Sequence, residues 1–181
     1  MELRYGYLRL VRDATNLSWL KTRGFDGYLV SMNQSGTHWL FNMLTLAMAK
    51  HYQLEVPRHI QNCHIIGSPK QPTGYAGIPS LARNHQIPNP LFTGRMAQWL
   101  LCTPGHVLLV RDLRVVLASH YKGFEATYRV DFSDYLRGRL DKMRAAGGPH
   151  KFDKDIWWGM RFLNSWGRVR RARPDAVRLV R

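Results

Sequence analysis

The sequence predicts one α/β domain with a parallel β-sheet and helices on both faces. Two observations point to this fold class. Short apolar segments typical of buried strands alternate along the chain with longer segments of helical periodicity. The 181 residues are 45% hydrophobic, which is enough for one core, and no repeat or low-complexity segment divides them. We therefore expect a single domain over residues 1–181, with ligands bound at the carboxyl ends of the strands.

Each element follows from its local pattern. Prolines and glycines concentrate between residues 53 and 79, which are predicted to be mostly loop, and Gly147-Gly148-Pro149 separates two helices. In the helix expected at 37–52, periodicity places Leu40, Met43, Leu44 and Met48 on one face. The expected strands are 27–32, a short one near 63–66, 80–85, 106–110 and 176–180; the expected helices are 8–20 (within an N-terminal helical segment, 1–25), 37–52, 91–101, 113–122, 132–145 and 154–172.

The composition restricts the class of protein. No segment approaches the roughly 18 apolar residues of a transmembrane helix. The N-terminal residues lack the apolar stretch of a secretory signal peptide. Two cysteines, Cys63 and Cys102, are too few for a disulfide framework or a metal site of their own. We expect a cytoplasmic protein with reduced thiols.

The formal net charge of +15 is concentrated near the end of the chain. Residues 137–181 hold 13 lysines and arginines against 4 acidic residues. Two interpretations stay open: a solvated helix end whose cations suit the helix dipole, or a surface for a polyanionic cofactor or an acidic acceptor. Nucleic acid is disfavoured as a partner, because the sequence has no RNA- or DNA-binding motif and no aromatic residues interleaved with the basic cluster.

Residues 28–43, YLVSMNQSGTHWLFNM, carry the most chemical information. An apolar strand-like segment runs into a small polar loop, and a helical pattern follows. This order builds a phosphate-binding loop, because free backbone N–H groups converge at the helix N-terminus. Gly36 permits close approach of a ligand, and the Ser35 and Thr37 hydroxyls can donate hydrogen bonds. The loop has neither the second glycine nor the lysine of an ATPase or GTPase P-loop.

A second segment of this kind, GHVLLVRDLRVVLASHY, occupies residues 105–121. Its strand leads to Arg111, and Ser119 lies about two helical turns further on. Together the two segments resemble the cofactor site of the sulfotransferase family that uses 3′-phosphoadenosine-5′-phosphosulfate. In that family a PKSGTTWL loop holds the 5′-phosphosulfate, and the Arg and Ser of a VRDPRDVLVSxY segment hold the 3′-phosphate. The corresponding segments of this sequence are NQSGTHWL at 33–40 and VRDLRVVLASHY at 110–121.

A third segment, ARNHQIP at 82–88, resembles the family's KTHLP, whose histidine is the catalytic base, so the resemblance makes His85 the base. Residues 162–166 and 173–180 resemble the helix and strand that precede the family's YEDL motif. The resemblance thus covers residues 26–181 and implies a P-loop-like sulfotransferase fold that is incomplete at the C-terminus.

The resemblance implies an enzyme that transfers a sulfuryl group to a hydroxyl or amine of a small-molecule or carbohydrate acceptor, without a metal. His85 would be the general base. Gln34 replaces the family's catalytic loop lysine, and an amide donates hydrogen bonds but carries no charge. The residues assigned to the nucleotide are Gln34, Ser35, Gly36, Thr37, His38, Trp39, Arg111 and Ser119.

Several of these residues also have a purely structural interpretation. Trp39 either stacks on adenine, as the matching family residue does, or belongs to the core. Arg111 either binds phosphate or pairs with Asp112, and His38 either touches phosphate or caps the helix. A loop histidine such as His85 is often structural. The pair Trp157-Trp158 is expected to pack in the core rather than to line a substrate pocket.

Two other functions remain as alternatives. The first is a non-catalytic module that binds a nucleotide or polyanion, which the uncharged Gln34 favours. The second is a nucleotide kinase, which the missing loop lysine and the lack of a convincing Mg²⁺ ligand disfavour.

Overall fold

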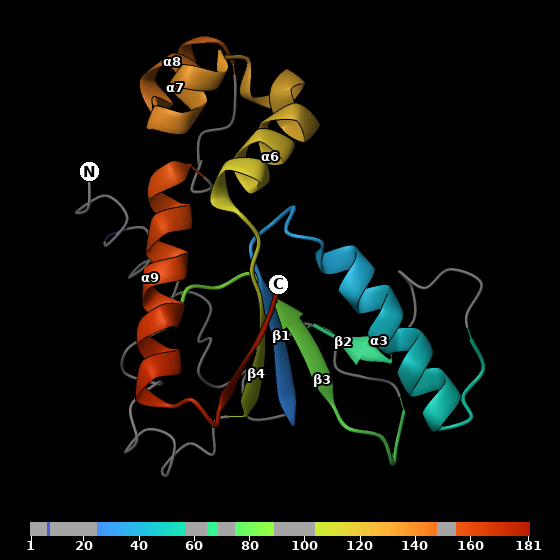
Figure 1. The fold of residues 1–181 in the computed structure, drawn as a ribbon. Helices are drawn as coiled ribbons and strands as arrows, with labels where there is room; N and C mark the ends of the chain where they lie inside the picture. The colour runs from blue at the N-terminus through green and yellow to red at the C-terminus, as the bar shows by residue number, and fades with distance from the viewer. Residues whose placement is uncertain (1–6, 8–24, 57–64, 69–74, 89–103, 148–154) are drawn as a thin grey trace.

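The computed structural model describes residues 25–56, 65–68, 75–88, 104–147 and 155–181, together with Tyr7. It shows an α/β fold with a five-stranded, all-parallel sheet (Figure 1). The strands are β1 (Gly27–Ser31), β2 (Ile66–Gly67), β3 (Leu81–Asn84), β4 (Gly105–Leu109) and β5 (Val177–Val180), and the helices are α3 (Thr37–His51), α6 (Leu113–Tyr128), α7 (Phe132–Arg137), α8 (Leu140–Ala145) and α9 (Ile156–Ala172).

The sheet order is β2-β3-β1-β4-β5, so β1 is its central strand. The pairing register sets Val30 beside Asn84 of β3, and Ser31 beside Leu109 of β4. The carboxyl ends of these three strands therefore lie at one edge. Figure 1 shows α6, α7 and α8 gathered beyond that edge.

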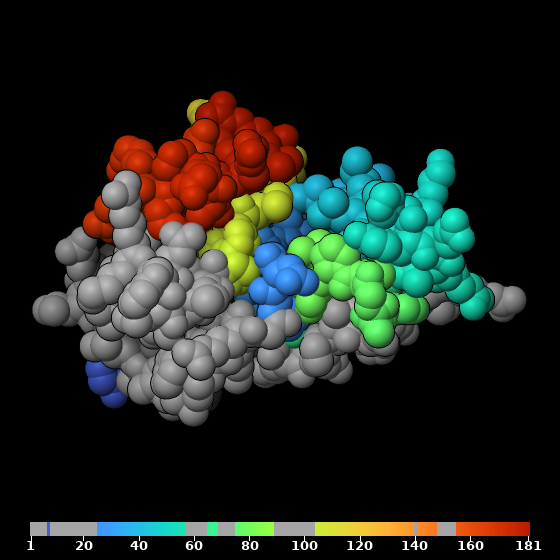
Figure 2. All heavy atoms as spheres, turned by 90° about the horizontal axis from the view of Figure 1, so that it is seen from below, coloured from blue at the N-terminus to red at the C-terminus, as the bar shows by residue number. Residues whose placement is uncertain are grey.

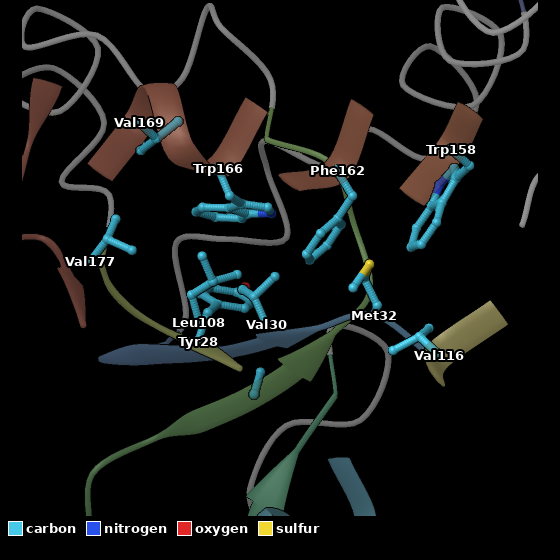
Figure 3. Close-up of a cluster of buried hydrophobic side chains, with 11 residues drawn as sticks. Tyr28, Val30, Met32, Leu108, Val116, Trp158, Phe162, Trp166, Val169 and Val177 are labelled. Carbon is cyan, nitrogen blue, oxygen red and sulfur yellow. The ribbon is translucent and has the colours of Figure 1, made fainter. Parts of the chain in front are cut away.

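The core divides into clusters on the two faces of the sheet. Alternate residues of β1 face α9, where Phe162 and Trp166 pack against Tyr28, Val30 and other buried side chains (Figure 3). On the other face α3 packs through Phe41 and Met48 against Ile66 and Leu81. Strand β1 is covered on both faces, which explains its continuously apolar sequence.

The helix expected at 132–145 is two helices, α7 and α8, and the prediction of one helix is wrong. The chain turns at Gly138, whose φ of 62° is left-handed. A Cβ at this glycine would lie 2.1 Å from Oδ2 of the buried Asp155, so only glycine allows this approach. Tertiary packing against Asp155 thus overrides the helical pattern.

Two other expectations need correction. The helix predicted at 113–122 continues through Gly123 to Tyr128 and ends where Arg129 adopts a left-handed conformation, φ 56°. In α3, Phe41 and Met48 are buried, whereas Met43 is 63% exposed and does not belong to the buried face. Phe41, which the aliphatic periodicity did not include, packs in the cluster between α3 and the sheet.

The other predicted elements are confirmed or lie outside the described residues. The strands expected at 27–32, 80–85, 106–110 and 176–180 and the helices at 37–52 and 154–172 match observed elements within about two residues. Of the strand near 63–66, the structure describes Ile66–Gly67. The helices expected at 8–20 and 91–101, with Cys63 and Cys102, lie outside the described residues. None of the helices in the described ranges is long and apolar enough to cross a membrane.

The burial of His106 on β4 predicts a pH dependence of stability. Its ring packs against Tyr28 and Trp166. Burial, and secondarily the positive charge of Arg173, lower the pKa of His106 from 6.5 to about 4. Between these values the unfolded chain binds the additional proton, so the free energy of unfolding should fall as the pH drops from 6.5 to about 4.

Replacing His106 with Phe keeps an aromatic ring and removes the titrating group. Urea unfolding measured across this pH range should show a weaker pH dependence for the variant than for the original protein. Equal slopes for the two proteins would mean that His106 does not titrate differently in the folded state.

Candidate functional site at the carboxyl edge of the sheet

The central position of β1 makes its carboxyl end a topological switch point. The chain leaves β1 through α3 towards the β2 side of the sheet, whereas it leaves β4 through the helices that lead to β5 on the other side. Ligands of open α/β sheets bind in the crevice that this divergence creates. The loop of residues 32–36 follows β1 at this point.

The loop is tightly wound. Gln34 and Gly36 both have left-handed backbones, with φ of 62° and 97°. The Ser35 hydroxyl donates to the carbonyl oxygen of Met32 at 2.6 Å, and the Ser35 N–H points to the same oxygen at 3.3 Å. These bonds brace the turn from strand to helix.

Helix α3 begins directly after this turn. Its N-cap is Gly36, which offers no side chain to the N–H groups of the first turn. The N–H groups of Thr37, His38 and Trp39 have no acceptor within the helix. An anion is therefore favoured at this end by hydrogen bonding and by the helix dipole.

A polar cluster of Ser31, Thr37 and His85 joins β1, α3 and the end of β3. The hydroxyls of Ser31 and Thr37 lie 2.7 Å apart. His85 Nδ1 lies 2.8 Å from the Ser31 carbonyl oxygen and 3.3 Å from the Ser31 hydroxyl. A carbonyl oxygen only accepts, so Nδ1 carries the proton in the neutral ring and Nε2 carries the lone pair.

His85 thus lies at the same edge as Gly36, within two hydrogen bonds of Thr37. The sequence did not single out Ser31, which links the two. The available signal was a hydroxyl residue at the end of an otherwise apolar strand, beside the loop. The hydroxyls of Ser35 and Thr37 are largely buried and bond inside the loop, so the backbone N–H groups are the outward-facing donors of this turn.

The segment after β4 supplies an exposed cation. Asp112 caps α6 by accepting from the Arg114 N–H at 2.9 Å, and its other oxygen pairs with the Arg114 guanidinium at 2.6 Å. These bonds lower the pKa of Asp112 to about 2. Asp112 therefore pairs with Arg114 and not with its neighbour Arg111, which is exposed at the strand end.

Helix α6 borders the loop. A Cβ built on Gly123 would lie 3.9 Å from the side-chain nitrogen of Gln34, so the amide of Gln34 approaches the bare surface of the helix. Ser119 lies one turn before Gly123 on the same face and is half-buried. Nothing in the sequence singled out Gly123, because its role depends on the Gln34 side chain that packs beside it in the folded protein.

A small cavity beneath the loop connects these elements with α9. It is lined by Met32, Asn33, Leu113, His120, Trp158 and Gly159, among others. Asn33 Oδ1 is buried without a hydrogen-bond partner among the described residues. His120 lies in a buried group where Nδ1 is 3.3 Å from the Tyr128 hydroxyl and 3.2 Å from that of Tyr135. The contact with Tyr135 joins α6 to α7.

Trp39 and His38 point away from the core. Trp39 is 77% exposed in the first turn of α3, which removes the interpretation of this residue as core. His38 is also exposed, and Gly36, not His38, is the N-cap. Of the expected packing pair, Trp158 is buried, whereas Trp157 is 44% exposed.

We compared the chain with protein-family models, curated proteins and solved structures, and none of them matches it. Among the described residues, no group of three His, Cys, Asp or Glu side chains is placed to hold a metal ion. The chemistry of the site is therefore inferred from the loop N–H groups, His85, Gln34 and Arg111.

The exposure of Trp39 predicts a contrast between two tryptophans. Trp39→Ala should change the free energy of unfolding by less than about 0.5 kcal/mol, because little area is buried there. Trp166→Ala should cost about 3–5 kcal/mol, since that indole is 3% exposed in the core. Urea denaturation of both variants measures the difference. A large loss for Trp39→Ala would show that its indole is packed in solution.

Proposed function

We propose that this protein is a sulfotransferase of the P-loop-like sulfotransferase fold, which transfers the sulfuryl group of 3′-phosphoadenosine-5′-phosphosulfate to an acceptor hydroxyl or amine. One observation carries the proposal. The three segments that resemble the family's motifs are far apart in the sequence, and the loop, His85 and Arg111 all follow strands that end at one edge of the sheet.

The loop is suited to the 5′-phosphosulfate. The N–H groups of the first turn of α3 provide donors, and the Gln34 amide adds a neutral donor where the family has a lysine. The exposed Trp39 would stack on adenine. Arg111 and Ser119 would share the 3′-phosphate, for which a guanidinium offers a forked, charge-assisted pair of hydrogen bonds.

His85 is suited to remove the acceptor proton. With Nδ1–H donated to the Ser31 carbonyl, the lone pair is on Nε2. The acceptor oxygen or nitrogen attacks sulfur, and its proton passes to Nε2. The bond between sulfur and the phosphate oxygen breaks, and adenosine 3′,5′-bisphosphate leaves with the electron pair. Positioning and preorganised donors provide the catalysis.

A binding module without transfer activity is the second candidate, and the uncharged Gln34 favours it. In a dry site the loss of one charged donor costs a few kcal/mol of transition-state stabilisation, of the order of 2.7–4 kcal/mol for a single donor. Binding of the bisphosphate without any transfer from the phosphosulfate donor would identify this function.

Ligand-induced thermal stabilisation tests the nucleotide assignment. Adenosine 3′,5′-bisphosphate should raise the melting temperature, because a ligand at 100 times its Kd stabilises the folded state by about 2.7 kcal/mol. ATP with Mg²⁺ should have no comparable effect. Stabilisation by ATP alone would favour a nucleotide kinase instead.

Arg111→Ala should weaken bisphosphate binding about tenfold or more, as expected for a charge-assisted hydrogen bond, and weaken adenosine 5′-phosphate binding much less. Arg114→Ala is the matched control, because it removes an exposed arginine of the same segment that already pairs with Asp112. Equal losses for both nucleotides in Arg111→Ala would remove this residue from the 3′-phosphate site.

His85→Ala should reduce sulfuryl transfer by about 10²–10⁴-fold, the usual contribution of a positioned base. Bisphosphate binding should stay nearly unchanged. Transfer is measured with ³⁵S-labelled donor and a panel of phenols, amines and sugars. His51→Ala, at the exposed end of α3, is the control. Normal turnover of folded His85→Ala would exclude this histidine as the base.

A further inference from the structure

Helix α9 carries a basic face with no acidic residue of its own to compensate it. Its 17 residues include Arg161, Arg168, Arg170 and Arg171 but no Asp or Glu, so no ion pair can form along the helix. The ion pairs that Arg114, Arg139 and Lys142 form with Asp112, Asp141 and Asp134 all lie outside α9.

Three of these arginines form a stripe. The core face of α9 contains Trp158, Phe162, Trp166 and Val169; helical geometry places Arg171 opposite this face and Arg161 and Arg168 on the adjoining flank. Arg168 and Arg171 are exposed and Arg161 is half-buried. Arg171 folds back along the helix, with Nη1 3.8 Å from the position of a Cβ on Gly167. From Arg161 to Arg171 the stripe is about 15 Å long.

The helix dipole accounts for only part of this pattern. Cations suit the last turn of a helix, which explains Arg170 and Arg171. Arg161 lies in the N-terminal half, where the dipole gives a cation no stabilisation. Among the described residues, the acidic side chains that flank the helix in sequence are the buried N-cap Asp155 and the exposed Asp175 beyond the C-terminal end. Neither is on the stripe.

The stripe runs along α9 with its Arg161 end nearer the candidate site and its Arg168–Arg171 end further from it. Helix α9 runs antiparallel to the strands, so its C-terminal end lies at the amino edge of the sheet and its N-terminal end at the carboxyl edge (Figure 1). A Cβ on Gly159 would meet Leu113, at the start of α6, and Gly159 also lines the cavity beneath the loop. Seen from the amino ends of the strands, α9 and β5 are at the molecular surface (Figure 2). Trp157 and Met160 are exposed at the end nearer the site.

We propose that the arginine stripe of α9 binds a linear, negatively charged sugar polymer, already sulfated or carboxylated, that serves as the acceptor. Guanidinium groups pair with sulfate and carboxylate in a forked geometry. A polymer that binds along the stripe and continues past Arg161 towards the start of α9 runs in the direction of the carboxyl edge, where His85 lies (Figure 1). A single-stranded nucleic acid is disfavoured, because Trp157 is the single exposed aromatic residue on this helix and stacking platforms are missing. The inference rests on the proposed function.

Binding of a fluorescent heparin octasaccharide to the whole protein tests the surface. Arg168→Gln/Arg171→Gln should weaken binding about tenfold at 0.15 M salt and lower the salt-dependence slope by about two. The matched control, Lys50→Gln/Arg144→Gln, removes two exposed charges from other helices and should change the affinity far less. Equal losses in the two double variants would show that only the net charge matters and would overturn the proposal.

Single-stranded DNA of the same charge is the second probe. Tighter binding of DNA than of heparin, with the same dependence on Arg168 and Arg171, would assign the stripe to nucleic acid and overturn the sugar polymer. Adenosine 3′,5′-bisphosphate stabilisation is measured in parallel on the same variants and should be unchanged. If heparin binds the stripe but the bisphosphate does not stabilise the protein, the proposed function fails while the polyanion surface stands.

Discussion

Strand β1 is paired on both edges and covered on both faces, and the arrangement of the site depends on this constraint. Tyr28, Leu29, Val30 and Ser31 are all at most 4% exposed. A strand buried in this way can turn only where the sheet ends, so the loop that follows emerges at the carboxyl edge between β3 and β4. The loop, the turn after β3 and the start of α6 are thereby placed around one crevice.

Hydrogen bonds convert this placement into a defined geometry. The carbonyl of Ser31 orients the His85 ring, and the hydroxyls of Ser31 and Thr37 tie the strand to the first turn of α3. Buried polar groups of this kind must be satisfied, since an unpaired one costs about 1–3 kcal/mol. The network therefore specifies one orientation of the histidine ring and leaves the helix N–H groups as donors for an anion.

Positive electrostatic features gather at two places in the described part of the molecule. The N-terminus of α3 and Arg111 are positive at the carboxyl edge, and the outer face of α9 extends this character along one side of the sheet. The negative charges of the described acidic residues near the site already have partners. Asp112 pairs with Arg114, and Asp155 caps α9 by accepting from the Trp158 N–H. Part of the net charge of +15 is therefore placed at this edge and along α9.

Local pattern by itself determined the central strand, the loop, α3 and the strand that leads to Arg111, because buried strands and helix starts leave periodic and compositional signals. His85 and Trp39 became candidates through the resemblance of their segments to family motifs. Only the tertiary structure decided that α7 and α8 are separate, that Met43 is exposed and that Ser31 joins Thr37 to His85. Each of these depends on a partner distant in sequence. Asp155 packs beside Gly138 and separates α7 from α8, the sheet packs against Phe41 instead of Met43, and the pairing of β3 with β1 brings His85 to Ser31. Such contacts are set by packing, which no local window of sequence contains.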